Sequence, residues 1–267
     1  MTEPKLIPLP PRQLWAKAEF HNQIELLLHF ASSSLTDFAI TDELTWVSTG
    51  IDDNTYNGVG WAQLNESNAD EMIQATLAHF IERDRPFLWY VDEDTLPSDL
   101  GERLEQQGCV SLPDGVSMAL KLHNMNAITK LVPGLTIKRV QTPAEMAQWS
   151  SVYNQDEQRE KLFISLGLEG DHRLRHYLAL LDDQPVGTSS AFWGSESVGL
   201  YHVEVIPEVR RQGIGTAITV APLLEAHRAG YQLAVLGPTP EAQSMYRRIG
   251  FELFPQHGKC YTLPSLY

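Results

Sequence analysis

The alternation of apolar and polar residues predicts most of the secondary structure of the second half of the chain. Three apolar runs between residues 176 and 207 are separated by turn signals at 182–185 and 194–197, a pattern typical of a three-stranded β-meander. A short strand is predicted at 231–236, and a closing strand region is predicted at 250–263. Helices are expected at 214–229 and 240–249.

A further helix is predicted ahead of the meander. Thr142 and Glu145 form a capping box, and Pro143 occupies the first helical position between them. Apolar residues then recur at helical spacing at Met146, Trp149, Val152 and Tyr153. This succession of helices and strands predicts a mixed α/β domain.

The first half follows a similar order with weaker signals. Strands are expected at 43–50, 56–64 and 86–91. The segment 68–84 predicts an amphipathic helix. Its apolar face consists of Ile73, Leu77, Phe80 and Ile81.

Two distant segments share one pattern, which indicates an internal repeat. Residues 100–120 and 242–263 each give a helix, a glycine (Gly108 or Gly250), a strand, a turn and a second strand. Self-similarity at this spacing suggests duplication of a whole domain. We therefore expect two domains of similar fold, residues 1–130 and 131–267.

Composition restricts the kind of protein. The 43% apolar and 20% charged residues are typical of a soluble globular chain. Only Cys109 and Cys260 are present, which gives no disulfide framework and fits a reducing cytoplasm. No apolar run reaches the ~20 residues that span a bilayer, and residues 1–15 do not resemble a signal peptide. The expected location is the cytoplasm.

The net charge of −14 bears on possible partners. It argues against general binding to nucleic acid or to an anionic membrane, and it weakly favours cationic partners. The alternative is that the excess of acidic residues only makes the protein more soluble.

The most informative stretch is VEVIPEVRRQGIGTAI, residues 203–218. A strand ends at Pro207, and a helix follows Gly213 and Gly215. Backbone N–H groups at a helix start have no partner within the helix, and glycines let a ligand approach them. With Arg210 and Arg211, this predicts an anion cradle suited to a pyrophosphate.

The alternative is an ordinary strand–helix turn with solvated arginines. The Walker A pattern is absent from the chain, and the third glycine of a Rossmann fingerprint is missing.

These residues resemble the GNAT superfamily of acyl-CoA-dependent N-acetyltransferases. The family signature [QR]-x-x-G-x-[GA] after V-x-P is matched by VIP at 205–207 and RRQGIG at 210–215. A second family element, a helix that ends in an aromatic residue and G-F, is matched by MYRRIGF at 245–251. The resemblance covers roughly residues 134–267. The first half looks like a degenerate copy that has lost the cradle.

The resemblance implies a site for acetyl-CoA. The strand that ends near Val205 would splay from the strand at 231–236, and the pantetheine arm would bond to backbone groups of Val203 and Val205. The N–H groups of 211–216 would hold the pyrophosphate. The expected cofactor-binding residues are Val203, Val205, Arg210, Arg211, Gln212, Gly213, Ile214, Gly215, Thr216 and Thr239.

The chain departs from the family pattern at two of its positions. Thr239 stands where many members have asparagine. Since Pro240 and Glu241 follow it, we expect it mainly to cap a helix, and contact with the cofactor is left open. Pro222 falls inside a predicted helix and is expected to bend it.

Acyl transfer to an amine also needs an acid and a base. Tyr246 matches the family tyrosine that protonates the leaving thiolate; a phenol with a pKa near ~10 is a reasonable donor to a thiolate whose acid lies near ~8.5. Packing in the core is the alternative role for Tyr246. His202 and Glu204 alternate on their strand, so they could share a face and act as base, directly or through water. The resemblance does not assign this role to Glu204, which could instead hold a cationic substrate.

The sequence thus predicts an N-acetyltransferase that moves an acetyl group from acetyl-CoA to a primary amine. No cysteine lies in either signature segment, so we expect direct attack in a ternary complex. No metal is expected: His172 and His176 are four residues apart, but a surface location is favoured for them. The acceptor is expected to be a small-molecule amine or a peptide, and its identity, the acyl length and the oligomeric state stay open. The alternatives are a non-catalytic acyl-CoA-binding regulatory or scaffold protein, and a structural protein with a vestigial site.

Overall fold

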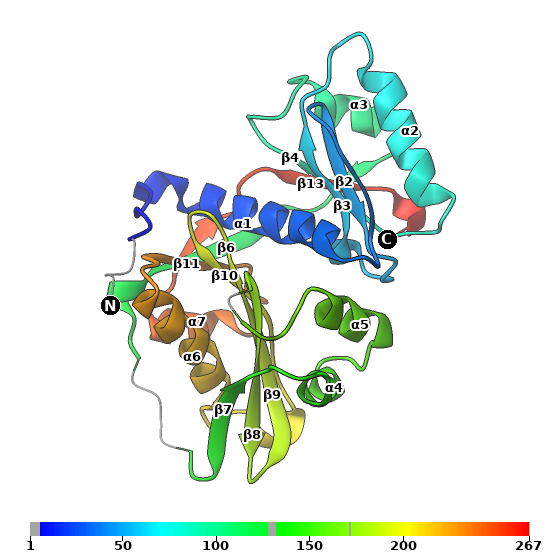
Figure 1. Cartoon of the computed structure of the whole chain (residues 1–267). Coiled ribbons are helices and arrows are strands. Elements are labelled where there is room, and N and C mark those ends of the chain that lie inside the picture. The colour runs from blue at the N-terminus through cyan, green and yellow to red at the C-terminus, as the bar shows by residue number, and fades with distance from the viewer. Residues whose placement is uncertain (1–5, 128–131, 171, 267) are drawn as a thin grey trace. The chain divides into compact units, whose positions relative to one another are not determined.

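The computed structural model describes residues 6–127, 132–170 and 172–266. Contacts divide the chain into two compact units, each made of two separate segments (Figure 1). Unit 1 consists of Met1–Asn22 and Val116–Pro255, and unit 2 consists of Gln23–Gly115 and Gln256–Tyr267.

Unit 1 is built on a seven-stranded mixed sheet in the order β12-β6-β11-β10-β9-β8-β7. In chain order its strands are β6 (Val116–Lys121), β7 (Leu135–Arg139), β8 (Leu174–Leu181), β9 (Gln184–Trp193), β10 (Val198–Val205), β11 (Leu233–Leu236) and β12 (Glu252–Pro255). Its helices are α4 (Pro143–Val152), α5 (Glu157–Ser165), α6 (Ile214–Arg228), α7 (Gln243–Ile249) and the first part of α1 (Trp15–His29). The predicted meander is confirmed as β8–β10.

Helices cover both faces of the unit 1 sheet. Ile214 and Ile218 of α6 belong to one buried apolar cluster with Tyr246 of α7 and Leu236 of β11. On the other face, Trp149 of α4 is 1% exposed, and its indole N–H donates to the carbonyl of Ser189 on β9. The predicted capping box at Thr142 and Glu145 is present at the start of α4. Pro222 lies inside α6, which continues from Ile214 to Arg228; the expected bend stays a prediction.

Unit 2 contains a six-stranded mixed sheet in the order β1-β2-β3-β4-β13-β5. Its strands are β1 (Asp37–Ile40), β2 (Leu44–Ser48), β3 (Asn57–Ala62), β4 (Leu88–Val91), β5 (Val110–Ser111) and β13 (Lys259–Thr262). The helices α2 (Ala69–Ile81) and α3 (Leu100–Gln106) pack on it, around a core that includes Ile73, Phe80 and Trp89. The strands and the helix expected between residues 43 and 91 are confirmed.

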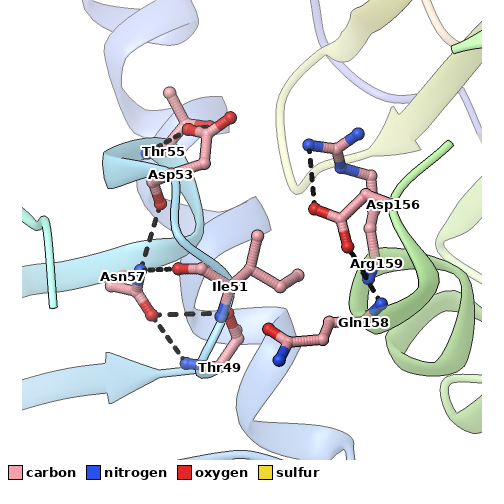
Figure 2. A network of polar contacts seen from close by, with 8 residues as sticks. All are labelled: Thr49, Ile51, Asp53, Thr55, Asn57, Asp156, Gln158 and Arg159. Carbon is pink, nitrogen blue, oxygen red and sulfur yellow. Dashed lines mark hydrogen bonds and ion pairs between the residues drawn. The ribbon is translucent and has the colours of Figure 1, made fainter. Parts of the chain in front are cut away.

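A buried asparagine fixes the turn before β3 (Figure 2). The side-chain amide of Asn57 donates to the carbonyls of Ile51, Asp53 and Pro86 at 2.8, 3.0 and 3.0 Å, and its oxygen accepts from the backbone N–H of Thr49 at 2.8 Å. Asn57 is fully buried. These bonds satisfy the carbonyls of Ile51 and Pro86 and the N–H of Thr49, and they give a second donor to the Asp53 carbonyl, which also accepts from the N–H of Tyr56.

The predicted repeat is visible in the order of the elements: residues 100–120 give α3, β5 and β6, and residues 242–263 give α7, β12 and β13. A second correspondence lies in the crossovers. In unit 1, β10, α6 and β11 form a strand–helix–strand crossover in which the two strands are parallel. In unit 2, β3, α2 and β4 form the same crossover with parallel strands. The expectation of two similar mixed α/β halves is confirmed.

The two halves exchange one strand each. β6 comes from the first half of the chain, yet it lies between β11 and β12 in the sheet of unit 1. β13 comes from the end of the chain, and it lies between β4 and β5 in unit 2, where Figure 1 shows it in red among blue and green strands. The closing region 250–263 therefore does not stay in one domain as expected, since β12 and β13 join different sheets. The division into domains 1–130 and 131–267 stays a prediction. Each compact unit contains residues from both sides of that boundary.

Candidate active site

The predicted cradle lies between the end of β10 and the start of α6. After Val205, a short 3₁₀ turn (Pro207–Val209) leads to Arg210, and Gly213 occupies the N-cap position of α6. Gly213 has φ 102° and ψ −6°, a left-handed conformation that L-residues adopt at a cost. Arg211 also has a positive φ, of 65°. These turns bring the free N–H groups of the first turn of α6 to the carboxyl end of β10.

Gly215 has a packing role in addition to any role toward a ligand. A Cβ at this position would lie 3.1 Å from the sulfur of Met245 on α7 and 3.8 Å from a methyl group of Val205. The absence of a side chain therefore lets the first turn of α6 approach both α7 and β10. The remaining residues of this turn differ in exposure: Gln212 is exposed, Ile214 is buried and Thr216 is partly buried.

Pairing between β10 and β11 is short. The register joins Val198 to Ala234 and Gly199 to Val235, and in the described part of the chain no later pair continues it. β10 continues to Val205, whereas β11 ends at Leu236, one residue after the last pair, so the expected divergence of these strands stays a prediction. Along β10, Val203 is partly buried and Val205 is buried.

Arg210 is bound to two of the other predicted site residues. Its Nη2 atom lies 2.6 Å from Oε1 of Glu204, and its Nε donates to the carbonyl oxygen of Val205 at 2.8 Å. Both charged side chains are substantially exposed, at 53% for Arg210 and 39% for Glu204. In this arrangement the guanidinium neutralises the carboxylate and covers the carbonyl that was expected to bind pantetheine.

Tyr246 lies on α7 and faces the core of unit 1. It is 6% exposed, and its ring meets that of Phe251 edge-on with centroids 5.7 Å apart. Burial raises the pKa of Tyr246 to about 12. The phenol therefore stays protonated through the physiological range and keeps a proton to donate.

His202 lies in a β-bulge. The register between β9 and β10 shifts between Tyr201 and Glu204, and His202 has φ 53°. The bulge interrupts the alternation from which a shared face for His202 and Glu204 was predicted. The two side chains instead have different surroundings, since Glu204 pairs with Arg210.

Aromatic rings surround the His202 side chain. The rings of Trp149, Tyr153 and Phe163 have centroids 5.6, 5.0 and 5.6 Å from that of His202. Burial, and to a smaller extent the charge of Arg159, lowers the pKa of His202 to about 3. His202 is therefore neutral at pH 7, and it is a weak base.

The expectation that Thr239 caps a helix is wrong. The N-cap of α7 is Ala242, and the backbone N–H of Ala242 donates to the carbonyl of Thr239 at 3.1 Å. Pro240 and Glu241 form a turn before the helix instead of its first turn. Thr239 is exposed and precedes that turn.

His176 does not lie at the surface. It belongs to β8, is 2% exposed, and its Nδ1 lies 2.8 Å from Oγ of Ser190. Burial lowers the pKa of His176 well below its usual value. A neutral histidine inside the sheet explains this residue without a metal.

One buried carboxylate was not identified from the sequence. Glu19 on α1 is 2% exposed, and its Oε2 accepts a hydrogen bond from Oγ of Ser117 on β6 at 2.8 Å. The available signal was weak: a glutamate flanked by Ala18 and Phe20 in an apolar stretch.

A second group of metal-ligating side chains lies in unit 2. Asp92, Glu93 and His257 bring one potential ligand atom each within 4.8 Å of one another. His257 Nε2 lies 2.9 Å from Oε2 of Glu93 and 3.7 Å from Oδ2 of Asp92. Both distances lie within the range of ion pairs.

The equivalent crossover in unit 2 does not form a cradle. The first turn of α2 carries Asp70 and Glu71, whose charges disfavour an anion there. Beyond the β3–β4 pairing, the chain itself binds to the end of β3: Leu96 donates to the carbonyl of Ala62, and Leu64 donates to the carbonyl of Leu96. This supports the expectation that the first half has lost the site.

Comparisons with known proteins agree with this geometry. Residues 172–253 match the family model described as an acetyltransferase (GNAT) domain. That segment includes β8–β11, α6 and α7. A comparison with curated proteins gave no match.

Several solved structures share the fold over most of the chain. A GCN5-related N-acetyltransferase from Kribbella flavida superposes with a TM-score of 0.66 at 17% identity and covers 94% of this chain and 96% of its own. A tandem GNAT protein from the clavulanic acid biosynthesis pathway gives 0.57 at 14% identity, with 92% and 94% covered. A glucosamine N-acetyltransferase region of a fungal multi-domain β-N-acetylglucosaminidase gives 0.62 at 15% identity, covering 90% of this chain and 34% of that protein.

Residues 172–253 therefore match a GNAT domain, and the two halves of the chain together have the fold of tandem GNAT proteins. At these levels of identity the structural matches establish the fold alone. None of the helices in the described ranges is long and apolar enough to cross a membrane.

Proposed function

We propose that the protein is an N-acetyltransferase that transfers the acetyl group of acetyl-CoA to a primary amine by direct attack in a ternary complex. The observation that carries this proposal is the glycine-initiated start of α6 at the carboxyl end of β10, inside the segment that matches the GNAT model. Only this one of the two equivalent crossovers is free of acidic residues in the first turn of its helix.

The residues present fit a pyrophosphate. Gly213 brings no side chain to the N-terminus of α6, and the first N–H groups of that helix need an acceptor from outside it. Arg211 is exposed beside them. Arg210 would have to leave Glu204 and the carbonyl of Val205 in order to contribute.

Acetyl-CoA would supply an activated acetyl group as a thioester. The acceptor nitrogen forms the new bond to the acetyl carbon while the carbon–sulfur bond breaks. Tyr246 is the proposed donor of a proton to the departing sulfur, a role that rests on its position on α7; the raised pKa keeps the phenol protonated and also makes it a weaker acid. Of the two proposed bases, His202 takes up an amine proton poorly because its pKa is about 3, so Glu204 is the base kept in this proposal.

Calorimetric titration with acetyl-CoA, with ATP as a comparison, tests the cofactor site. We expect micromolar affinity, around −8 kcal/mol, and no response to ATP. Failure to bind acetyl-CoA would exclude the proposal.

The Tyr246→Phe variant separates catalysis from binding. We expect an unchanged affinity for acetyl-CoA and a fall in kcat of about 10²-fold or more, measured as release of free thiol with a panel of primary amines. Unchanged turnover would remove Tyr246 as the acid. Binding of acetyl-CoA without turnover of any amine by the wild type would favour a non-catalytic acyl-CoA-binding protein.

A further inference from the structure

Glu19 is a buried carboxylate that the proposed chemistry does not yet use. It lies in the part of α1 that belongs to unit 1, and its Oε2 is held by the hydroxyl of Ser117 at 2.8 Å. The position of Glu19 relative to the sheet indicates its function.

Glu19 faces the end of β11. The antiparallel register pairs Leu236 with Met118, so the next positions, Gly237 and Ser117, also lie opposite each other. A Cβ on Gly237 would lie 3.7 Å from Oε1 of Glu19. The last pair between β10 and β11 is formed two positions earlier, at Val235. The carboxylate is therefore placed at the end of β11, beyond the last pair between β10 and β11.

The Glu19 carboxylate approaches the sheet from the face opposite α6 and α7. Ala234 and Leu236 of β11 pack in the same cluster as residues of α6 and α7. Leu233 and Val235 pack with Trp15 of α1 instead. Side chains alternate along a strand, so position 237 belongs to the face that α1 covers.

Neighbouring contacts hold α1 in place over this part of the sheet. One turn after Glu19, the side-chain oxygen of Asn22 accepts from the hydroxyl of Tyr201 at 2.7 Å, and its amide donates to the carbonyl of Ser197 at 3.0 Å. A Cβ at Gly199 would clash with the Asn22 side chain, so this glycine permits the close approach. Glu19 is thus presented by a fixed helix and not by a loop.

From this placement we propose that Glu19 binds the ammonium group of a cationic amine acceptor at the acyl-transfer site. The inference rests on the proposed function, because it takes the divergence of β10 and β11 as the place of transfer. A carboxylate shielded from water attracts an ammonium group more strongly than an exposed one does. The net charge of −14 also favours positively charged ligands over anionic ones.

Calorimetric titration of the full chain with 1,4-diaminobutane tests the inference without requiring turnover. We expect saturable binding by the wild type and at least tenfold weaker binding by Glu19→Gln, which keeps the shape of the side chain and removes its charge. Gly237→Ala should also weaken binding about tenfold, because its methyl group would stand beside Oε1 while Glu19 itself stays intact. Glu252→Gln is the matched control: it removes the same charge from an exposed carboxylate that pairs with Arg12, and it should change the dissociation constant less than threefold.

The two proposals fail in different ways. If the diamine does not bind, or if it binds equally well to wild type, Glu19→Gln and Gly237→Ala, the ammonium site is wrong whatever acetyl-CoA does. If diamine binding depends on Glu19 but acetyl-CoA does not bind, the ammonium site stands and the acetyltransferase proposal fails. Thermal unfolding of each variant shows whether a loss of diamine binding is caused by misfolding. If Glu19→Gln does not fold, the result for Gly237→Ala decides whether the ammonium site is correct.

Discussion

Gly213 is the position where charge can be placed in the cradle with little change in shape. Its φ of 102° disfavours most side chains, but asparagine and aspartate tolerate left-handed conformations and also serve as N-caps. Gly213→Asn and Gly213→Asp have nearly the same size and should both lose roughly 1 kcal/mol of stability to the backbone. The pair therefore isolates one negative charge.

The effect of that charge on binding can be worked out from its place. A carboxylate at about 5 Å from one phosphate charge, at an effective dielectric constant of about 20, is repelled by about 3 kcal/mol. This corresponds to more than a hundredfold increase in the dissociation constant for acetyl-CoA. Gly213→Asn should keep the affinity within several-fold of the wild type.

Calorimetric titration of both variants at equal ionic strength measures the difference, and thermal unfolding checks that their stabilities match. The gap between the two variants should narrow as salt is added, since salt screens exposed charges. Equal dissociation constants for Gly213→Asn and Gly213→Asp would refute the reasoning, because no phosphate could then lie at the start of α6.

Three further changes test other parts of the structure. Glu204→Gln frees Arg210 from an exposed ion pair worth about 0–1 kcal/mol, so acetyl-CoA should bind up to about fivefold more tightly by calorimetry; weaker binding would contradict this account of the pair. His202 has a folded pKa of about 3, below its value near 6.5 in the unfolded chain, so the unfolded state gains a proton first and stability is lost as pH falls from about 6.5 toward 3. Urea unfolding at pH 7 and pH 4.5 should therefore show a smaller loss for His202→Gln than for the wild type, and an identical loss would exclude this cause. Asn57→Ala leaves backbone groups of a buried turn unpaired, so it should lower the free energy of unfolding of the chain by about 2–4 kcal/mol; a change below 1 kcal/mol would show that water replaces the lost bonds.

Local signals in the sequence were sufficient for much of the fold. The capping box at Thr142 set the start of α4, and turn residues set the limits of the meander. The glycines and arginines of 210–215 identified the start of α6 because a glycine at φ 102° is a local requirement. Such features depend on a few adjacent residues, so they can be read without knowing what lies across the sheet.

Features that depend on distant contacts were not predictable in this way. Periodicity shows that 116–121 and 259–262 are strands, but it does not state which sheet each joins. The bulge at His202 depends on its register with β9, and the pairing of Arg210 with Glu204 depends on how the chain turns after β10. Glu19 was missed because burial of a charged residue follows from helix packing and not from its neighbours in the sequence.

The exchange of β6 and β13 also bears on the order in which the protein can be made. β13 is an interior strand between β4 and β5, so the sheet of unit 2 stays incomplete until residues 259–262 have emerged from the ribosome. A nascent chain that has produced only the first half therefore exposes the edges of β4 and β5, which can pair wrongly with other chains. It also carries β6, whose partners β11 and β12 are synthesised more than a hundred residues later. We expect folding to be completed after translation and to involve the whole chain, so that expressing either half alone yields aggregated protein.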